Sequence, residues 1–107
     1  MRLQVKGRNV EVTPSIRAYA ESRLAKLERQ LAEETPVEIE LASETHHAEH
    51  IAEGIVFAKG PTLRARETAG DLRAAIDRLA ENLERQVGRY REKRRHEPRR
   101  RTAHHGV

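Results

Sequence analysis

The sequence predicts an α+β fold, a two-layer α/β sandwich in which two helices cover one face of a four-stranded sheet. The chain has 107 residues, enough for one domain with one core. Only 36% of the residues are hydrophobic, but they fall in periodic groups that change between strand and helix spacing. The groups follow the order β-α-β-β-β-α, and packing both helices on one face of the sheet buries the apolar side of every element.

The first strand is expected before residue 7, where Leu3 and Val5 alternate with polar residues. A helix start follows at Thr13, because a threonine hydroxyl accepts a backbone N–H at an N-cap and Pro14 is tolerated at the first helical position. Apolar residues then recur at helical spacing, which predicts a first helix from Pro14 to Glu33.

A second strand is expected after Thr35-Pro36, since the residue before a proline is disfavoured in a helix. In this strand Val37, Ile39 and Leu41 alternate with glutamates, which predicts one buried and one exposed face.

The third strand is expected to bury the parity that contains Ile51, Ile55 and Phe57. Gly60-Pro61 then predicts a turn into a fourth strand near Leu63, in which apolar residues alternate with arginines. The third and fourth strands should form a hairpin.

The second helix is expected to begin after Gly70-Asp71, with the aspartate as its cap. Its apolar stripe consists of Leu72, Ile76, Leu79, Leu83, Val87 and Tyr90. The helix should end near His96, because a proline at position 98 disrupts helical hydrogen bonding. A domain over 1–96 would then be followed by a basic tail over 97–107 that is disordered when free. The run Arg99–Arg101 fits either a nucleic-acid-binding arm or a solvated chain end.

Charge is distributed unevenly along the chain. Through Gly70 there are 10 Lys and Arg against 11 Asp and Glu, and from Asp71 onward there are 11 against 6. A basic C-terminal third predicts a polyanionic partner, with RNA, DNA and an anionic membrane all open on charge alone. The absence of cysteine excludes disulfides and thiolate zinc sites. Without a long apolar run or a signal peptide, the protein is expected to be soluble and cytoplasmic.

No arrangement of residues predicts catalysis. Glu38 and Glu40 lie on the exposed parity of their strand, and none of the three serines has the context of a nucleophile. The histidines at 46, 47 and 50 fall in a predicted loop, where they are not expected to bind a metal. We therefore expect no enzyme activity, no cofactor and no small-molecule substrate.

Two segments resemble the ribosome hibernation promoting factors, a family also labelled ribosome-associated inhibitor or sigma-54 modulation protein. They are GRNVEVTPSIRAYAESRLAKLER at 7–29 and LRARETAGDLRAAIDRLAENLERQVGRYREK at 63–93, together more than half of the chain. The resemblance implies a fold similar to a double-stranded RNA-binding domain. It also implies binding to the small ribosomal subunit and its ribosomal RNA, between head and body. There the protein overlaps the messenger and transfer RNA positions and blocks translation by occupancy.

The resemblance places basic side chains of both helices against ribosomal RNA. On this chain they are Arg23, Lys26 and Arg29 in the first helix and Arg78, Arg85, Arg89 and Lys93 in the second, with Arg94 and Arg95 beside them. The simpler alternative is that these charges only keep the surface soluble, and an i,i+4 pair between Glu81 and Arg85 would support it for that arginine.

Two features depart from the family pattern. Asp71 is followed by Leu72, where the family usually has an aromatic residue. Longer members continue into a C-terminal domain that pairs ribosomes, whereas this sequence stops at Val107. It is therefore either a short member or the N-terminal domain of a longer one, and a homodimer or a ribosome-pairing partner stays open.

Tyr19, Phe57 and Tyr90 are the aromatic residues, and all three fall on predicted apolar stripes. RNA recognition should therefore depend on shape and phosphate, with little reading of bases and Tyr90 as the one candidate aromatic contact. The alternative function is a protein-interaction module that modulates a sigma factor through the exposed sheet face, which bears Glu38, Glu40, Arg64 and Arg66. A membrane-surface helix is disfavoured, because the apolar stripe of the helix is needed to cover the sheet.

Overall fold

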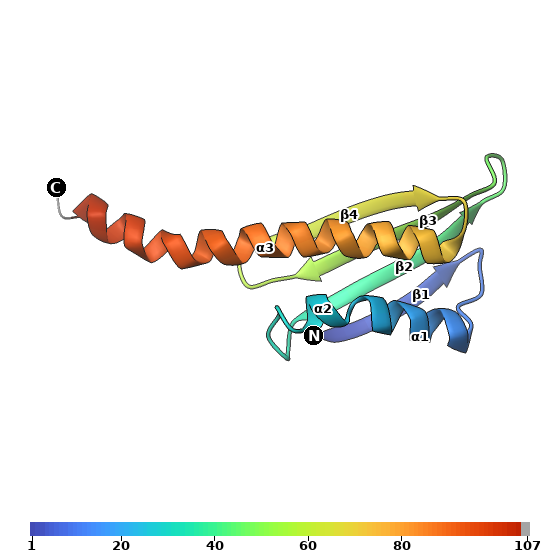
Figure 1. Ribbon diagram of the computed structural model, residues 1–107, viewed down its shortest axis with the longest axis horizontal. Coiled ribbons are helices and arrows are strands. Elements are labelled where there is room, and N and C mark those ends of the chain that lie inside the picture. The colour runs from blue at the N-terminus through green and yellow to red at the C-terminus, as the bar shows by residue number, and fades with distance from the viewer. Residues whose placement is uncertain (106–107) are drawn as a thin grey trace.

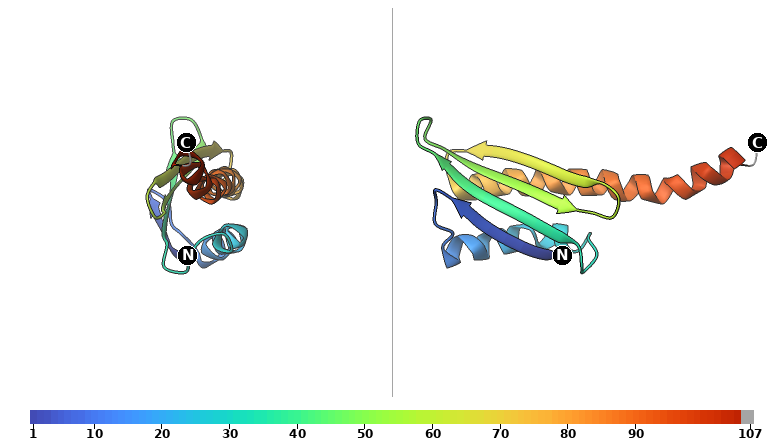
Figure 2. Two further views of the ribbon diagram at one scale, coloured as in Figure 1. Left: turned by 90° about the vertical axis from the view of Figure 1, so that its left-hand side faces the viewer. Right: turned by 180° about the vertical axis from the view of Figure 1, so that it is seen from behind.

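The computed structural model describes the backbone of residues 1–105 and the side chains of residues 1–93. Its elements are β1 (Arg2–Arg8), α1 (Pro14–Arg23), α2 (Ala25–Glu28), β2 (Pro36–Glu44), β3 (Glu49–Phe57), β4 (Thr62–Ala69) and α3 (Leu72–His105). The four strands form one sheet, and the helices cover one of its faces while the other stays open (Figure 1 and Figure 2). This confirms the predicted α+β fold.

The sheet has the order β1-β2-β3-β4. β1 runs parallel to β2, as expected for two strands joined by a helical crossover, and the other two pairs are antiparallel hairpins. One row across the sheet, Val5, Ile39, Gly54 and Ala65, faces the helices.

The core lies between this face and the two helical segments. The largest side chains that are at most 1% exposed come from α2 and its N-cap, from α3 and from the central strands: Leu24, Leu27, Ile76, Leu79, Leu83, Val87, Val37, Ile39, Leu41 and Val56. Burying one such side chain stabilises the fold by about 1.5–3 kcal/mol. The predicted caps are also present, since Thr13 Oγ1 accepts from Ile16 N at 3.1 Å and Asp71 Oδ1 accepts from Ala74 N at 2.8 Å.

The first helix is shorter than predicted. The helical path breaks at Leu24, where φ is −92° and ψ is 4°, and α2 ends at Glu28 instead of Glu33. The break turns Leu24 and Leu27 into the core, where they are 1% and 0% exposed. The residues after α2 form turns that hydrogen-bond to the start of the sheet, where Arg2 N donates to Thr35 O at 2.7 Å. Tertiary burial therefore outweighs the helical periodicity here.

The parity predicted for β3 was wrong. The residues of β3 that face the helices are Ala52, Gly54 and Val56, while Phe57 is 38% exposed. Both parities carry apolar residues, and the space under α3 decides between them. A Cβ atom at Gly54 would lie 3.0 Å from Leu83 Cδ1, so a larger residue does not fit on this side.

The predicted end of the second helix was also wrong. α3 continues through Pro98 to His105, and its last turns project beyond the sheet as expected (Figure 1). A proline removes one helical hydrogen bond and crowds the preceding turn at a cost of about 3 kcal/mol, but its φ is compatible with a helix. The division into a domain over 1–96 and a tail over 97–107 stays a prediction. Residues 106 and 107 of that tail lie outside the described part of the chain.

Candidate nucleic-acid interface

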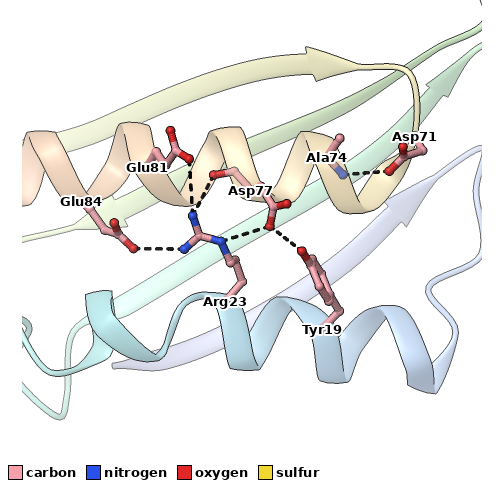
Figure 3. Close-up of polar contacts among 7 residues, drawn as sticks. All are labelled: Tyr19, Arg23, Asp71, Ala74, Asp77, Glu81 and Glu84. Atoms are coloured by element: carbon pink, nitrogen blue, oxygen red, sulfur yellow. Dashed lines mark hydrogen bonds and ion pairs between the residues drawn. The ribbon is translucent and has the colours of Figure 1, made fainter.

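Arg23 joins α1 to α3 (Figure 3). Its Nε donates to Asp77 Oδ1 at 3.0 Å, and its two terminal nitrogens lie 3.4 Å from Glu84 Oε2 and 3.7 Å from Glu81 Oε1. Only 29% of the Arg23 side chain is exposed. Three carboxylates thus surround one guanidinium. The positive charge of Arg23 is therefore already balanced within the protein and is less available to an RNA phosphate.

Tyr19 extends the same contact by one helical turn. Its hydroxyl donates to Asp77 Oδ1 at 2.5 Å (Figure 3). This hydrogen bond, with smaller effects of burial and of the Asp77 charge, raises the pKa of Tyr19 above its ordinary value. On its ring lies the Arg73 guanidinium, 4.9 Å from the centroid, and Arg73 also donates to Ser15 Oγ at 2.9 Å. These contacts among Tyr19, Arg23, Arg73 and Asp77, which we call the polar seam, fix α1 against α3.

Arg78 hydrogen-bonds to the edge strand of the sheet. Its guanidinium donates to Thr68 O at 2.6 Å. Further along α3, the Gln86 side chain donates to Arg64 O at 2.7 Å. Both acceptors are carbonyls of β4, the strand at one edge of the sheet. Side chains that cap an edge strand in this way block pairing with another chain. Arg78 is thus exposed, but its guanidinium already hydrogen-bonds to a backbone carbonyl of β4.

A groove of about 330 Å³ runs between α2 and α3 and is lined by Lys26 and Arg85. The groove also contains Gln30, Glu81, Glu84 and Gly88. Gly88 has open space above it, since a Cβ atom there would meet nothing within 4 Å. The possible pair between Glu81 and Arg85 does not form among the described side chains, and Glu81 instead lies 3.7 Å from Arg23 on the neighbouring helix.

Five of the predicted residues form no ion pair among the side chains that the structure describes. They are Lys26, Arg29, Arg85, Arg89 and Lys93, all exposed. Of these, Lys26 and Arg85 line the same groove, and exposed cations without a carboxylate partner are available for phosphate. The side chains of Arg94 and Arg95 lie outside the described residues. The nine predicted residues therefore separate into five unpaired cations, two structural ones and two that are not described.

The open face of the sheet has a different charge pattern. Glu40 pairs with Lys6 at 3.9 Å and with Arg8 at 3.1 Å, and Glu53 pairs with Arg8 at 3.9 Å and with Arg66 at 3.7 Å. The strand register explains the pairs, since Lys6, Glu40, Glu53 and Arg66 stand in one row across the sheet. Alternating charge makes this face a weaker match for RNA than the helical side.

The structure adds features that sequence reasoning missed. Arg73 lies over the Tyr19 ring. In the sequence, its i,i+4 spacing from Asp77 was the feature that could have indicated its place in the polar seam. Arg91 is a further exposed cation beside the predicted ones. His50 Nδ1 lies 3.1 Å from Ser43 Oγ, and the residues that the structure covers contain no group of three His, Cys, Asp or Glu that could hold a metal ion. None of the described helices is long and apolar enough to cross a membrane.

Comparison with known proteins gives the family of the chain. It is 35% identical over 101 residues to a ribosome hibernation promotion factor of Lactococcus lactis, covering 92% of this chain and 54% of that protein. A ribosome hibernation promoting factor of Salmonella typhimurium is 32% identical over 87% of this chain and 96% of its own. The chain thus spans about half the length of the first relative and nearly all of the second.

Solved structures agree with this relationship. The N-terminal domain of Thermus thermophilus Protein Y superposes with a TM-score of 0.75 at 37% identity, over 84% of this chain and 99% of that domain. A ribosomal subunit interface protein from Coxiella burnetii has the same TM-score and fold at 24% identity, over 87% of this chain and 100% of its own. The family model described as "Sigma 54 modulation protein / S30EA ribosomal protein" matches residues 3–95. The chain therefore belongs to the sigma 54 modulation protein / S30EA ribosomal protein family.

Proposed function

We propose that this chain is a ribosome hibernation factor that binds the small ribosomal subunit through its ribosomal RNA. One observation supports this most strongly: in a chain whose relatives are named hibernation factors, the helices carry five exposed cations that form no ion pair among the described side chains. The proposal needs no catalytic step, cofactor or small-molecule substrate. It places the protein in the cytoplasm, where ribosomes act.

Inhibition would follow from occupancy of the messenger and transfer RNA channel. The molecule measures 58 × 27 × 17 Å, and its length comes from α3 extending beyond the sheet (Figure 1). The seam between Tyr19, Arg23 and Asp77 keeps both helices in a fixed relation. A rigid body that occupies the channel excludes RNA without chemistry, and its affinity depends on how many phosphates it contacts.

The salt dependence of binding tests the phosphate contacts. Neutralising about five to seven phosphates predicts that log affinity falls against log salt with a slope of roughly −4 to −6. The measurement is co-sedimentation with purified small subunits at several salt concentrations, with ribonuclease treatment expected to release the protein. A nearly flat slope would contradict an interface built on these cations. A separate sedimentation measurement of the protein without subunits shows whether it forms a homodimer.

A matched control comes from the open face of the sheet. Arg64 is an exposed arginine on the open sheet face that does not line the groove between α2 and α3, and Arg64→Glu changes the net charge by as much as a reversal at Arg85. If the helical side binds RNA, Arg64→Glu should bind small subunits much like the parent. A loss as large as that of Arg85→Glu would show that overall charge, and not this surface, governs binding.

The second candidate function is a protein-interaction module that modulates a sigma factor. It is favoured by the family description and by a hollow of about 400 Å³ on the open sheet face, whose lining includes Glu38, Glu40, Arg64 and Arg66. Binding of a purified sigma factor that is lost in Arg64→Glu and kept in Arg85→Glu would support this candidate over the first.

A further inference from the structure

A second hollow, of about 480 Å³, lies at the end of the sheet where α3 leaves it. Its lining includes Gln30, Leu31, Glu34, Phe57, Lys59 and Tyr90. Phe57 is the one large hydrophobic side chain that is exposed among the residues whose side chains are described. The hollow therefore combines an accessible aromatic ring with a lining of both apolar and polar residues.

The position of these walls is fixed by the fold. Val56 takes the buried position of β3, and this leaves Phe57 on the other side of the strand end. The Tyr90 hydroxyl donates to Lys59 O at 2.7 Å, which ties the turn between β3 and β4 to α3. The aromatic surface is thus held in place before any ligand arrives, which lowers the entropic cost of binding.

The hollow adjoins the groove between α2 and α3. Lys59 lines the hollow itself, and Gln30 lines both the hollow and the groove. Arg29 and Arg89, which directly precede lining residues in α2's C-terminal turn and in α3, are exposed and unpaired among the described side chains. Glu34 is the one acidic side chain in the lining. An anionic strand that follows the groove would therefore reach the aromatic surface.

We propose that this hollow receives one unstacked base of the bound RNA, stacked on the ring of Phe57. The inference rests on the proposed function and extends it from phosphate contact to contact with a base. Bases in single-stranded loops and bulges stack on exposed aromatic rings, and cations near the ring hold the flanking phosphates. The volume lies in the usual range for ligand pockets. The sequence alone predicted little contact with bases, because it assigned Phe57 to the core.

Two substitutions at Phe57 test the stacking directly. Phe57→Ala should weaken binding to purified small subunits by about 5- to 150-fold, the loss that corresponds to one stacked base. The slope of log affinity against log salt should not change, because no phosphate contact is removed. Phe57→Trp should keep the affinity. Since the chain has no tryptophan, the introduced indole is a unique fluorophore, and a short single-stranded oligoadenylate should quench it.

The control is Ile55→Ala, two residues earlier on the same strand and on the open sheet face. It should bind like the parent, and thermal unfolding should show that all variants are folded. If the parent binds and Phe57→Ala binds equally well, the base pocket is wrong while the proposed function stands. If the parent does not bind subunits, the proposed function fails, and the oligoadenylate alone decides the pocket. Weaker binding of Phe57→Ala without quenching in Phe57→Trp would assign the hollow to a protein side chain and overturn the inference.

Discussion

The Nε atom of Arg23 donates to Asp77 Oδ1 at 3.0 Å, and the same carboxylate oxygen accepts from the Tyr19 hydroxyl at 2.5 Å. One oxygen of α3 thus holds two side chains of α1 that are one helical turn apart. Glu81 and Glu84 add two further carboxylates around the guanidinium. The contact fixes the angle between the helices that carry the candidate interface.

Replacing Arg23 should affect folding more than RNA binding. Arg23→Gln removes a hydrogen-bonded cation and leaves three carboxylates close together, so the free energy of unfolding should fall by about 1–3 kcal/mol. Urea denaturation measures this loss. In co-sedimentation with small subunits, the folded variant should keep the salt slope of the parent.

Lys26→Gln is the matched comparison, since Lys26 is exposed and unpaired among the described side chains. Its stability should change by less than about 0.5 kcal/mol, as is usual for a surface substitution. Its salt slope should decrease by about one unit, as expected for the loss of one phosphate contact. If Arg23→Gln lowered the slope as much as Lys26→Gln does, Arg23 would have to leave its carboxylates and bind RNA.

The seam also predicts a stability change at alkaline pH. The hydrogen bond to Asp77 raises the pKa of Tyr19 above its ordinary value of about 10. A raised pKa in the folded state means that the stabilisation is complete below pH 10 and is lost as pH rises through the folded pKa. Tyr19→Phe lacks this ionisation, so the stability difference between parent and variant should narrow above pH 10. Urea denaturation of both proteins between neutral and alkaline pH measures it, and a constant difference would contradict the assignment.

Local periodicity was enough to predict most of the fold. Leu79 and Leu83 recur at helical spacing and are 1% and 0% exposed, and Val37 and Ile39 alternate with glutamates and are 0% and 1% exposed. In these elements only one face is apolar, so the pattern allows one orientation. The order of elements then leaves few ways to bury all the apolar faces.

The failures arise where contacts distant in sequence decide the outcome. In β3 both parities are apolar, and the choice depends on the space that Leu83 leaves beside Gly54. Arg23 and Asp77 are 54 residues apart, so the charge pattern of either helix alone could not reveal that they pair. The same limit applies to Phe57, whose exposure follows from the orientation of β3.

The close approach of β3 to α3 gives a prediction about packing. Gly54→Ala adds a methyl group 3.0 Å from Leu83 Cδ1 and 3.1 Å from Ile39 Cδ1, which should cost about 1–3 kcal/mol through overpacking. Leu83→Ala removes a fully buried side chain and should cost about 2–5 kcal/mol.

The double variant should lose less stability than the sum of the two, because the new methyl group fills part of the space left by the leucine. Thermal or urea unfolding of the three variants measures the coupling. Strictly additive losses of stability would show that β3 and α3 do not share this space. Ile55→Ala on the open face is the control, because its loss of stability should add to that of either variant without coupling.

Reversing two cations of α3 should separate RNA binding from stability. Arg85 and Arg89 are exposed, lie off the apolar stripe and form no ion pair among the described side chains. Arg85→Glu with Arg89→Glu places a carboxylate four residues after Glu81, and this new like-charge pair should lower the free energy of unfolding by only a few tenths of a kcal/mol. Each reversal removes a phosphate contact and adds repulsion against the RNA backbone. The folded double variant should therefore no longer co-sediment with small subunits or inhibit translation in an extract, whereas Arg64→Glu should retain both activities. A double variant that binds and inhibits like the parent would show that the groove between α2 and α3 is not the RNA-binding surface.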